Sequence, residues 1–295
     1  GEILEHHNVS LDNSTDVDDL IRSLGEVFET TSGAKRGCVG IGVVVPGLFD
    51  IRSGTVMQAY ALNWRDVPLK ALLQKVFDLP VVVEKETCAG LLAEEYYGTM
   101  KRVENSIYVY VGTGIGSAIM VDGKLHRGST SMAGELGHIV IDENGPLCRC
   151  GQRGCLEAFV SGPRVVEMAK EAANQHPNGI LAELLRTANG VLFPQSVVYE
   201  AAERGAPEAV RIVRKVGDYI ARAIGGVIMM VNPEVVFIGG EVYTGRRLLV
   251  ESIQQALPQY GLQIAIASTS ILPASFDFRQ GMMGVTAELL KASVR

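Results

Sequence analysis

The stretch GELGHIVIDENGPLCRCGQRGCLE, residues 134–157, brings His138, Cys148, Cys150 and Cys155 close together along the chain. Zinc binds thiolate sulfur and imidazole nitrogen in a tetrahedron, at about 2.0 to 2.3 Å. Three thiols and one imidazole would fill that shell and leave no position open for water. The residues therefore predict a structural Zn2+ site. The alternative is three unrelated cysteines in a loop beside an unrelated histidine.

Tight turns are needed for the Cys-x-Cys pair and Cys155 to surround one ion. Gly151 and Gly154 permit such turns, because glycine adopts left-handed backbone conformations without a steric penalty. The chain has five cysteines, and their clustering indicates metal ligation in a reducing compartment rather than a set of disulfides. We therefore expect a cytoplasmic protein.

Outward from this loop, strand patterns alternate with helix patterns. Short apolar, β-branched runs predict buried strands at residues 38–45, 79–83, 106–111 and 234–238. Apolar residues at helical spacing predict helices at residues 16–28, 67–77, 87–97, 163–173, 196–204, 208–231 and 280–292. This alternation is typical of an α/β protein with a largely parallel sheet.

Two lobes are expected, because a chain of 295 residues is long enough for two cores. A hairpin pattern over residues 107–121 breaks the alternation and indicates the start of a second lobe. We expect a smaller α/β lobe over residues 1–100 and a larger one, with the zinc loop and an oligomer surface, over 101–279. The last helix, within residues 280–295, is expected to return to the first lobe. Residues 1–4 resemble the second half of a hairpin, so N-terminal strands of that lobe are expected upstream.

The composition excludes two classes of partner. The net charge of −6 is the wrong sign for a surface that contacts nucleic-acid phosphates. No apolar run reaches the roughly 18 residues that a membrane-spanning helix requires. We therefore expect neither DNA binding by this stretch itself nor a membrane partner.

Two glycine-rich segments follow predicted strands. Gly112-Thr113-Gly114 joins the strands of the hairpin, and Gly239-Gly240 follows the strand pattern at 234–238. Backbone N–H groups in such turns can bind a phosphate or a sugar hydroxyl. The first turn does not open a helix, so it does not match the dinucleotide-binding fingerprint. A tight hairpin without a ligand remains the alternative, and the same choice applies to Gly239-Gly240.

Polar side chains near predicted strand ends form a third candidate set, which consists of Asn63, Glu86, Glu135 and Glu157. Ligands of open α/β sheets bind beyond the carboxyl ends of strands. Glu86 is therefore well placed to accept hydrogen bonds from hydroxyls or to act as a base. Carboxylates and amides suit a sugar, whereas the alternative is a set of solvated helix caps.

The motifs Gly112-Thr-Gly-Ile-Gly116, Ala133-Gly-Glu-Leu-Gly-His138 and Cys148-x-Cys-Gly-x-x-Gly-Cys-Leu-Glu157 together closely resemble the signature of the ROK family of bacterial sugar repressors, open reading frames and sugar kinases. The resemblance extends over nearly the whole chain. It implies a ribonuclease H-like, actin-type two-lobed fold with a sugar in the interlobe cleft. It also implies a zinc site at His138 and the three cysteines, and sugar contacts from Asn63, Glu86, Glu135, His138 and Glu157.

Two departures from the family's kinases favour a regulator. The kinases of the family that this chain resembles carry Glu-Asn-Asp after the corresponding strand, and the aspartate is the general base. This sequence has Glu84-Lys85-Glu86 there. A displacement of about 1 Å can reduce a rate roughly 100-fold. The Asp-x-Gly-Gly-Thr turn that receives ATP phosphates in such kinases does not occur in this sequence. Glu86 would thus be catalytic only in a kinase. The corresponding nucleotide site would be vestigial or weak, with residues Gly112, Thr113, Gly114, Gly239 and Gly240.

We therefore expect the sugar-sensing, oligomerising effector part of a ROK-family transcriptional repressor. It would bind a monosaccharide or sugar derivative and form a homodimer or homotetramer. DNA would be bound only by a winged helix-turn-helix N-terminal to this sequence. Lys85 favours a phosphorylated or acidic sugar. The alternatives are an ATP-dependent sugar kinase and a zinc-bearing oligomerisation module without a ligand.

Overall fold

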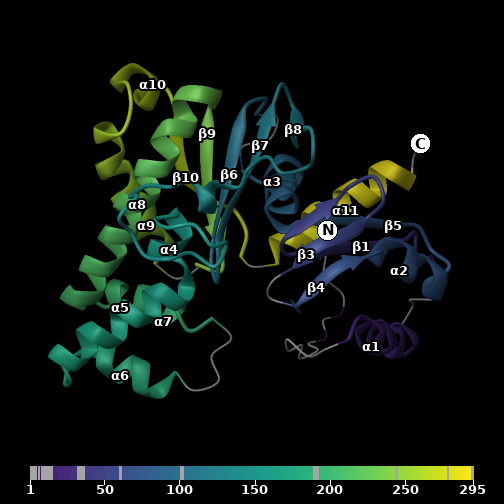
Figure 1. Ribbon diagram of the computed structural model, residues 1–295, viewed down its shortest axis with the longest axis horizontal. Coiled ribbons are helices and arrows are strands. Elements are labelled where there is room, and N and C mark those ends of the chain that lie inside the picture. Colours follow the sequence, from purple (N-terminus) through teal and green to yellow (C-terminus); the bar gives the residue numbers. More distant parts are fainter. Residues whose placement is uncertain are drawn as a thin grey trace. The chain divides into compact units, whose positions relative to one another are not determined.

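The chain forms two compact units (Figure 1). The structure, a computed structural model, describes residues 5, 7, 16–31, 37–59, 62–99, 103–188, 193–242, 245–277 and 279–293. Unit 1 comprises Gly1–Tyr96, Arg127–Met132 and Arg279–Arg295, and unit 2 comprises Tyr97–His126 and Ala133–Phe278. Residues 1–4, where the sequence predicts half of a hairpin, lie outside the described residues.

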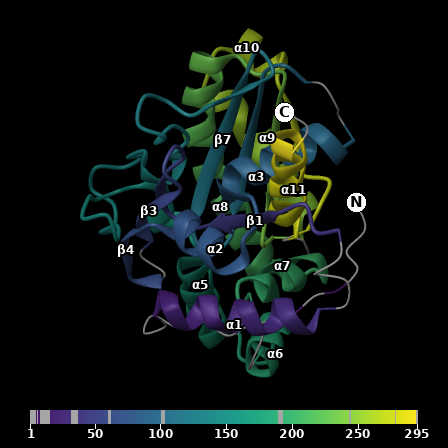
Figure 2. The ribbon, with the colours of Figure 1, turned by 90° about the vertical axis from the view of Figure 1, so that its right-hand side faces the viewer.

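A parallel pair of strands lies at the centre of unit 1. Strand β1 (Ile41–Val45) pairs with β5 (Val81–Lys85), and helix α11 (Gln280–Ser293) packs on both. Figure 2 shows α11 beside β1. The approach of α11 is close: a Cβ at Gly42 would lie 2.8 Å from a methyl carbon of Val285. The C-terminal helix thus packs directly on the parallel strands of the first unit.

The rest of unit 1 consists of an antiparallel sheet and three helices. The sheet contains β2 (Leu48–Asp50), β3 (Thr55–Ala59) and β4 (Trp64–Val67), in that order. The helices are α1 (Val17–Thr30), α2 (Leu69–Phe77) and α3 (Glu86–Tyr97). Apolar side chains from both sheets, α1 and α2 form one core, which includes Ile21, Val45, Phe49, Val56, Trp64, Leu73 and Val83.

Unit 2 is built on a mixed sheet with the strand order β10-β9-β6-β7-β8. Its strands are β6 (Ser106–Val111), β7 (Ile115–Val121), β8 (Lys124–His126), β9 (Val235–Gly240) and β10 (Ser270–Pro273). The strands β6, β9 and β10 are parallel, whereas β7 runs antiparallel to both of its neighbours. Every residue of β9 is buried, as expected for a strand covered on both faces.

Helices surround this sheet, and α8 is the longest. They are α4 (Leu156–Val160), α5 (Gly162–Gln175), α6 (Ile180–Thr187), α7 (Ser196–Glu203), α8 (Pro207–Val231), α9 (Arg246–Ala256) and α10 (Gln263–Ala267), with 3-10 turns at Leu136–His138 and Leu257–Gln259. Helix α8 approaches α9 closely, because a Cβ at Gly217 would lie 2.6 Å from the Cβ of Ser252.

The α/β prediction is confirmed, and the predicted strands and helices occur with small shifts at their ends. The sequence patterns do not predict the meander β2–β4, the strands β8 and β10 or the helices α4, α6, α9 and α10. These strands have only three to five residues, too few to give a clear alternation of apolar and polar positions. Among the described residues, no helix combines the length and the apolar character needed to cross a membrane.

Candidate functional site

The four predicted zinc ligands converge in unit 2. The ligand atoms of His138, Cys148, Cys150 and Cys155 all lie within 4.8 Å of one another. The Cys148 Sγ to His138 Nδ1 distance is 3.8 Å, and the Cys150 Sγ to Cys155 Sγ distance is 3.7 Å. Ligand atoms around a tetrahedral zinc lie about 3.5 to 3.8 Å apart, so this set fits a zinc ion.

Glycines give the ligand loop its shape. Gly151 has φ +90°, and its N–H donates to the Cys148 carbonyl at 3.0 Å. Gly154 has φ +74°, and a Cβ there would lie only 1.6 Å from the Asp142 carbonyl oxygen. Gly151 thus supplies a left-handed turn, while Gly154 supplies both a turn and a close approach of two backbone segments.

The thiols of the cluster differ in acidity. Burial raises the pKa of Cys148, and it raises the pKa of Cys155 to about 12. A hydrogen bond from the backbone N–H of Gln152 lowers the pKa of Cys150. A metal ion binds thiolates, so loading this site would release thiol protons.

The same loop positions two of the candidate carboxylates. Glu135 directly precedes the 3-10 turn that carries His138, and Glu157 lies two residues beyond Cys155. A hydrogen bond of 2.9 Å from Leu156 N–H to the Ile139 carbonyl joins the two segments. A metal held by the loop would therefore also fix the backbone on which Glu135 and Glu157 stand.

Glu157 lies against the glycine-rich turn between β6 and β7. Its carboxylate accepts the backbone N–H of Ile115 at 3.3 Å. A Cβ at Gly114 would lie 2.8 Å from the same carboxylate oxygen. The loop, Glu157 and the turn thus form one continuous polar region of unit 2.

The remaining predicted sugar contacts, Asn63 and Glu86, belong to unit 1. Asn63 has φ 53° and directly precedes β4. Glu86 begins α3 immediately after β5 and is partly exposed. The structure therefore brings Glu135, His138 and Glu157 together within unit 2 and places Asn63 and Glu86 on separate elements of unit 1.

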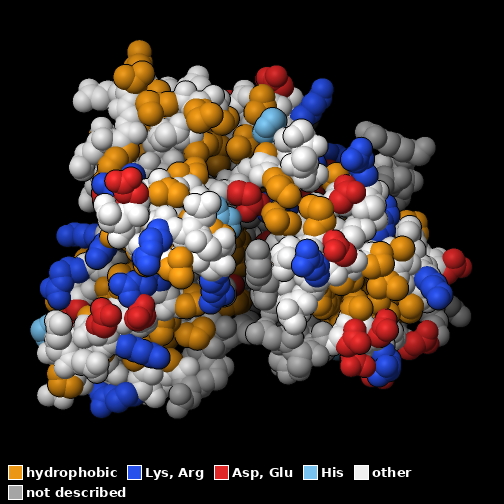
Figure 3. All heavy atoms as spheres, in the orientation of Figure 1, with side chains coloured by type: hydrophobic (Ala, Val, Ile, Leu, Met, Phe, Trp, Pro, Cys, Tyr) orange, Lys and Arg blue, Asp and Glu red, His pale blue; other side chains and the backbone are white. Residues whose placement is uncertain are grey.

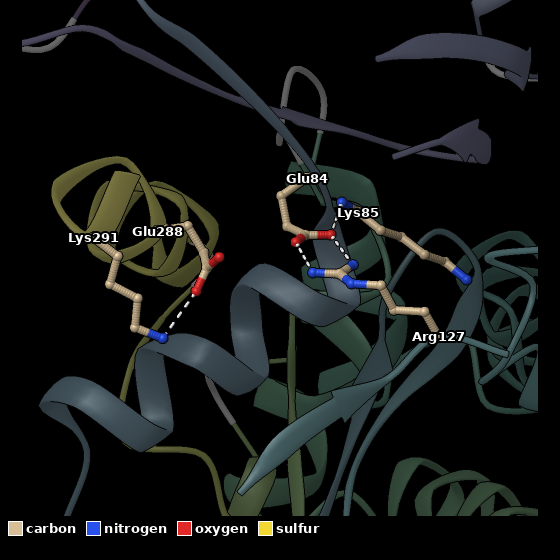
Figure 4. A network of polar contacts seen from close by, with 5 residues as sticks. All are labelled: Glu84, Lys85, Arg127, Glu288 and Lys291. Atoms are coloured by element: carbon tan, nitrogen blue, oxygen red, sulfur yellow. Dashed lines mark hydrogen bonds and ion pairs between the residues drawn. The ribbon is translucent and has the colours of Figure 1, made fainter. Parts of the chain in front are cut away.

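A buried ion pair next to Glu86 was missed by sequence reasoning (Figure 4). Both carboxylate oxygens of Glu84 accept hydrogen bonds from the Arg127 guanidinium, at 2.9 and 2.6 Å. The Glu84 side chain is 2% exposed and that of Arg127 is 22% exposed. Burial works against the charge of Arg127, yet the hydrogen bonds and charge of Glu84 raise its pKa overall. Nothing in the local sequence indicates that these two residues meet.

The Gly112-Thr113-Gly114 turn connects β6 and β7, as predicted, and an unpredicted residue caps it. Glu241 accepts the backbone N–H of Thr113 at 2.7 Å and the Thr113 hydroxyl at 3.1 Å. The Tyr110 hydroxyl donates to the same carboxylate at 2.9 Å, and the Gln195 amide also donates to it. The available signal was the position of Glu241 directly after Gly239-Gly240.

These two glycines have a structural role. In the parallel pairing of β6 with β9, Tyr110 lies opposite Gly239 and Val111 lies opposite Gly240. A Cβ at Gly239 would lie 2.2 Å from the Tyr108 hydroxyl. Gly240 has φ +98°, and a Cβ there would lie 2.5 Å from the Val111 carbonyl oxygen. Packing alone therefore accounts for both glycines, and it brings Glu241 to the turn.

Comparison with known proteins gives both regulators and enzymes. A sequence model of the ROK family matches residues 1–292. The xylose repressor of Caldicellulosiruptor bescii is 30% identical over 278 residues, covering 90% of this chain and 69% of that protein. The glucokinase of Halalkalibacterium halodurans is 34% identical over 252 residues, covering 85% of this chain and 76% of that protein.

Among solved structures, a ROK family glucokinase from Streptomyces griseus, in complex with glucose and AMPPNP, superposes with a TM-score of 0.82 at 26% identity. The match covers 93% of this chain and 88% of that one. The predicted actin-type, two-lobed α/β fold is thereby confirmed. Similarity to repressors and to kinases is comparable, so the comparisons do not separate these two activities.

Replacing Cys155 tests the metal site. The purified protein is expected to contain about one zinc ion per chain, because the four ligand atoms match a tetrahedral shell. Cys155→Ser should lose most of this zinc and lower the melting temperature, whereas Cys38→Ser, at an exposed cysteine outside the cluster, should do neither. Elemental analysis and thermal denaturation measure both effects. Two results together would contradict the site: purified protein that contains no zinc, and a melting temperature that a chelator does not change.

Replacing Arg127 tests the buried ion pair. Arg127→Met leaves the Glu84 carboxylate buried without its partner, and the free energy of unfolding should fall by about 3 kcal/mol. Arg22→Met is the control, because the pair of Arg22 with Asp19 is exposed on α1 and contributes less than about 1 kcal/mol. Urea denaturation compares the two variants. Equal losses of stability would show that the burial of Glu84 has no energetic consequence.

Proposed function

Because the chain belongs to the ROK family, we propose that it is the sugar-sensing effector part of a transcriptional repressor of that family. One observation carries the choice of repressor over kinase. Glu86 begins α3 directly after β5, at the position where the resemblance places the catalytic aspartate of a kinase. The strand-to-helix junction determines the backbone there, so the additional methylene of glutamate displaces the carboxylate from the position of an aspartate base.

We further propose that the ligand is a monosaccharide or a sugar derivative, with hydroxyl contacts from Asn63, Glu86, Glu135, His138 and Glu157. The metal-binding loop supports this proposal, because it holds Glu135 and Glu157 on a rigid backbone. A pre-organised set of carboxylates binds hydroxyl groups with little loss of side-chain entropy. The zinc would be structural, since all four of its coordination positions are taken by protein atoms.

The proposed signal is a change in the population of conformations. A sugar that binds one conformation more tightly shifts the equilibrium towards it by its difference in affinity. A DNA-binding segment N-terminal to this sequence would report that shift. In this arrangement sugar binding needs no chemical step, and an ATP-dependent reaction is not required for function.

A sugar kinase is the second candidate, and the 34% identity with a glucokinase favours it. The two candidates differ in one measurable product. A kinase releases ADP in a coupled assay with ATP and its sugar, whereas the repressor part binds the sugar without ADP release.

Titration calorimetry with a panel of monosaccharides tests sugar sensing. At least one sugar should give heat with the zinc-loaded protein. Glu157→Gln should then weaken binding about tenfold or more, because a charged hydrogen-bond acceptor is lost. Glu167→Gln, on the exposed side of α5, is the matched control. No heat from any sugar would instead favour a zinc-bearing oligomerisation module, and ADP release with ATP would favour the kinase.

We also propose that the chain self-associates, as a homodimer or homotetramer, through the apolar surface at the end of α8 and over α10. Met230, Leu262 and Ile264 are 88%, 66% and 82% exposed, and Figure 3 shows hydrophobic side chains gathered over α10. Met230→Lys should lower the molar mass measured by light scattering. Val39→Lys, at an exposed apolar residue of unit 1, is the control. A monomeric wild-type protein would refute this proposal.

A further inference from the structure

Four hydrogen-bond donors converge on the Glu241 carboxylate. They are the backbone N–H and the hydroxyl of Thr113, the Tyr110 hydroxyl and the Gln195 amide. Tyr110 and Thr113 belong to the β6–β7 segment, whereas Gln195 and Glu241 lie far along the sequence, so their meeting is a property of the tertiary structure. A site with a backbone N–H and three side-chain donors has the composition of an anion-binding site.

The surroundings hold this site in place. Gln195 is buried, with 4% of the residue exposed, so bulk water does not compete for its amide. The Gly162 N–H donates to the Gly112 carbonyl at 2.8 Å, which ties the turn to the start of α5. A Cβ at Gly112 would lie 2.7 Å from the carboxyl carbon of Glu241. Glycine at this position therefore admits the carboxylate to the turn.

A carboxylate and a phosphate compete for the same donors. The carboxylate is a planar anion and the phosphate a tetrahedral one, and the oxygens of both accept hydrogen bonds from N–H and O–H groups. A phosphate at Thr113 would have to displace the Glu241 carboxylate. Otherwise it would lie beside that negative charge, and the nearby donors would already be bound to Glu241. Two negative charges in contact repel each other, which adds to the loss of free donors.

We propose that Glu241 is an internal anion that fills the Gly112-Thr113-Gly114 turn and excludes the phosphates of a nucleotide. Glu241 is thus a specificity-determining residue of the turn that sequence reasoning interpreted as a vestigial nucleotide site. The inference concerns phosphate binding alone and stands independently of the proposed sugar sensing.

Calorimetry with inorganic phosphate and with magnesium AMPPNP tests this inference. The wild-type protein should bind neither at millimolar concentration. Glu241→Ala removes the carboxylate that these donors contact, so phosphate should bind at least about tenfold more tightly than to the wild type. Glu241→Gln removes the charge while keeping the shape, and it should show a smaller gain. If the alanine variant does not fold, the glutamine variant decides.

Two further variants separate filling of the turn from a general effect of charge. Glu203→Gln removes another carboxylate of unit 2, which accepts the Gly245 N–H at 2.6 Å, and it should gain no phosphate binding. Tyr110→Phe combined with Glu241→Ala removes one of the freed donors and should weaken the gained affinity several-fold.

Wild-type protein that binds AMPPNP as tightly as the Glu241 variants would overturn the inference, as would folded variants that gain no affinity for phosphate. Sugar titrations of the same proteins report separately on sugar sensing. If no sugar gives heat with the wild-type protein while the phosphate titrations give the expected results, sugar sensing is refuted and the inference about Glu241 stands.

Discussion

The parallel pairing of β6 with β9 is the constraint on which the polar region of unit 2 depends. It requires glycine at positions 239 and 240, because any side chain there would collide with Tyr108 or with the backbone at Val111. The pairing brings the residue after β9, Glu241, to the turn that follows β6. Through β7 the same sheet supports the segment before the metal ligands, since Ser117 N–H donates to the Gly134 carbonyl at 2.9 Å. The metal loop and the turn thus share one rigid support.

Carboxylates in this protein take different roles because their neighbours differ. Glu84 is buried and its charge is balanced by the Arg127 guanidinium, so it stabilises unit 1 and is not available to a ligand. Glu241 is satisfied by neutral donors of the glycine-rich turn. Glu157 accepts the backbone N–H of Ile115 and retains acceptor capacity for hydroxyl groups. Residue type alone does not distinguish these three cases.

Two glutamates favour the proposed sensor over a kinase. Glu86 carries a longer side chain than the aspartate expected of a kinase, and Glu241 offers a negative charge where a phosphate needs donors. Both features are compatible with sugar binding and unfavourable for phosphoryl transfer. They belong to different units, so they are independent indications. Together they explain how a chain similar to glucokinases could serve as a sensor instead.

The sequence alone is enough to predict the cluster of three cysteines and one histidine, because its four residues lie within one short segment whose glycines allow the necessary turns. It also determined the buried strands β1, β5, β6 and β9 and the long helices, because each has a local apolar pattern. The pairs Glu84–Arg127 and Thr113–Glu241 follow from the folding of the whole chain, because their members lie 43 and 128 residues apart in the sequence. Such contacts depend on strand pairing and chain reversal between distant segments, and no local periodicity records them.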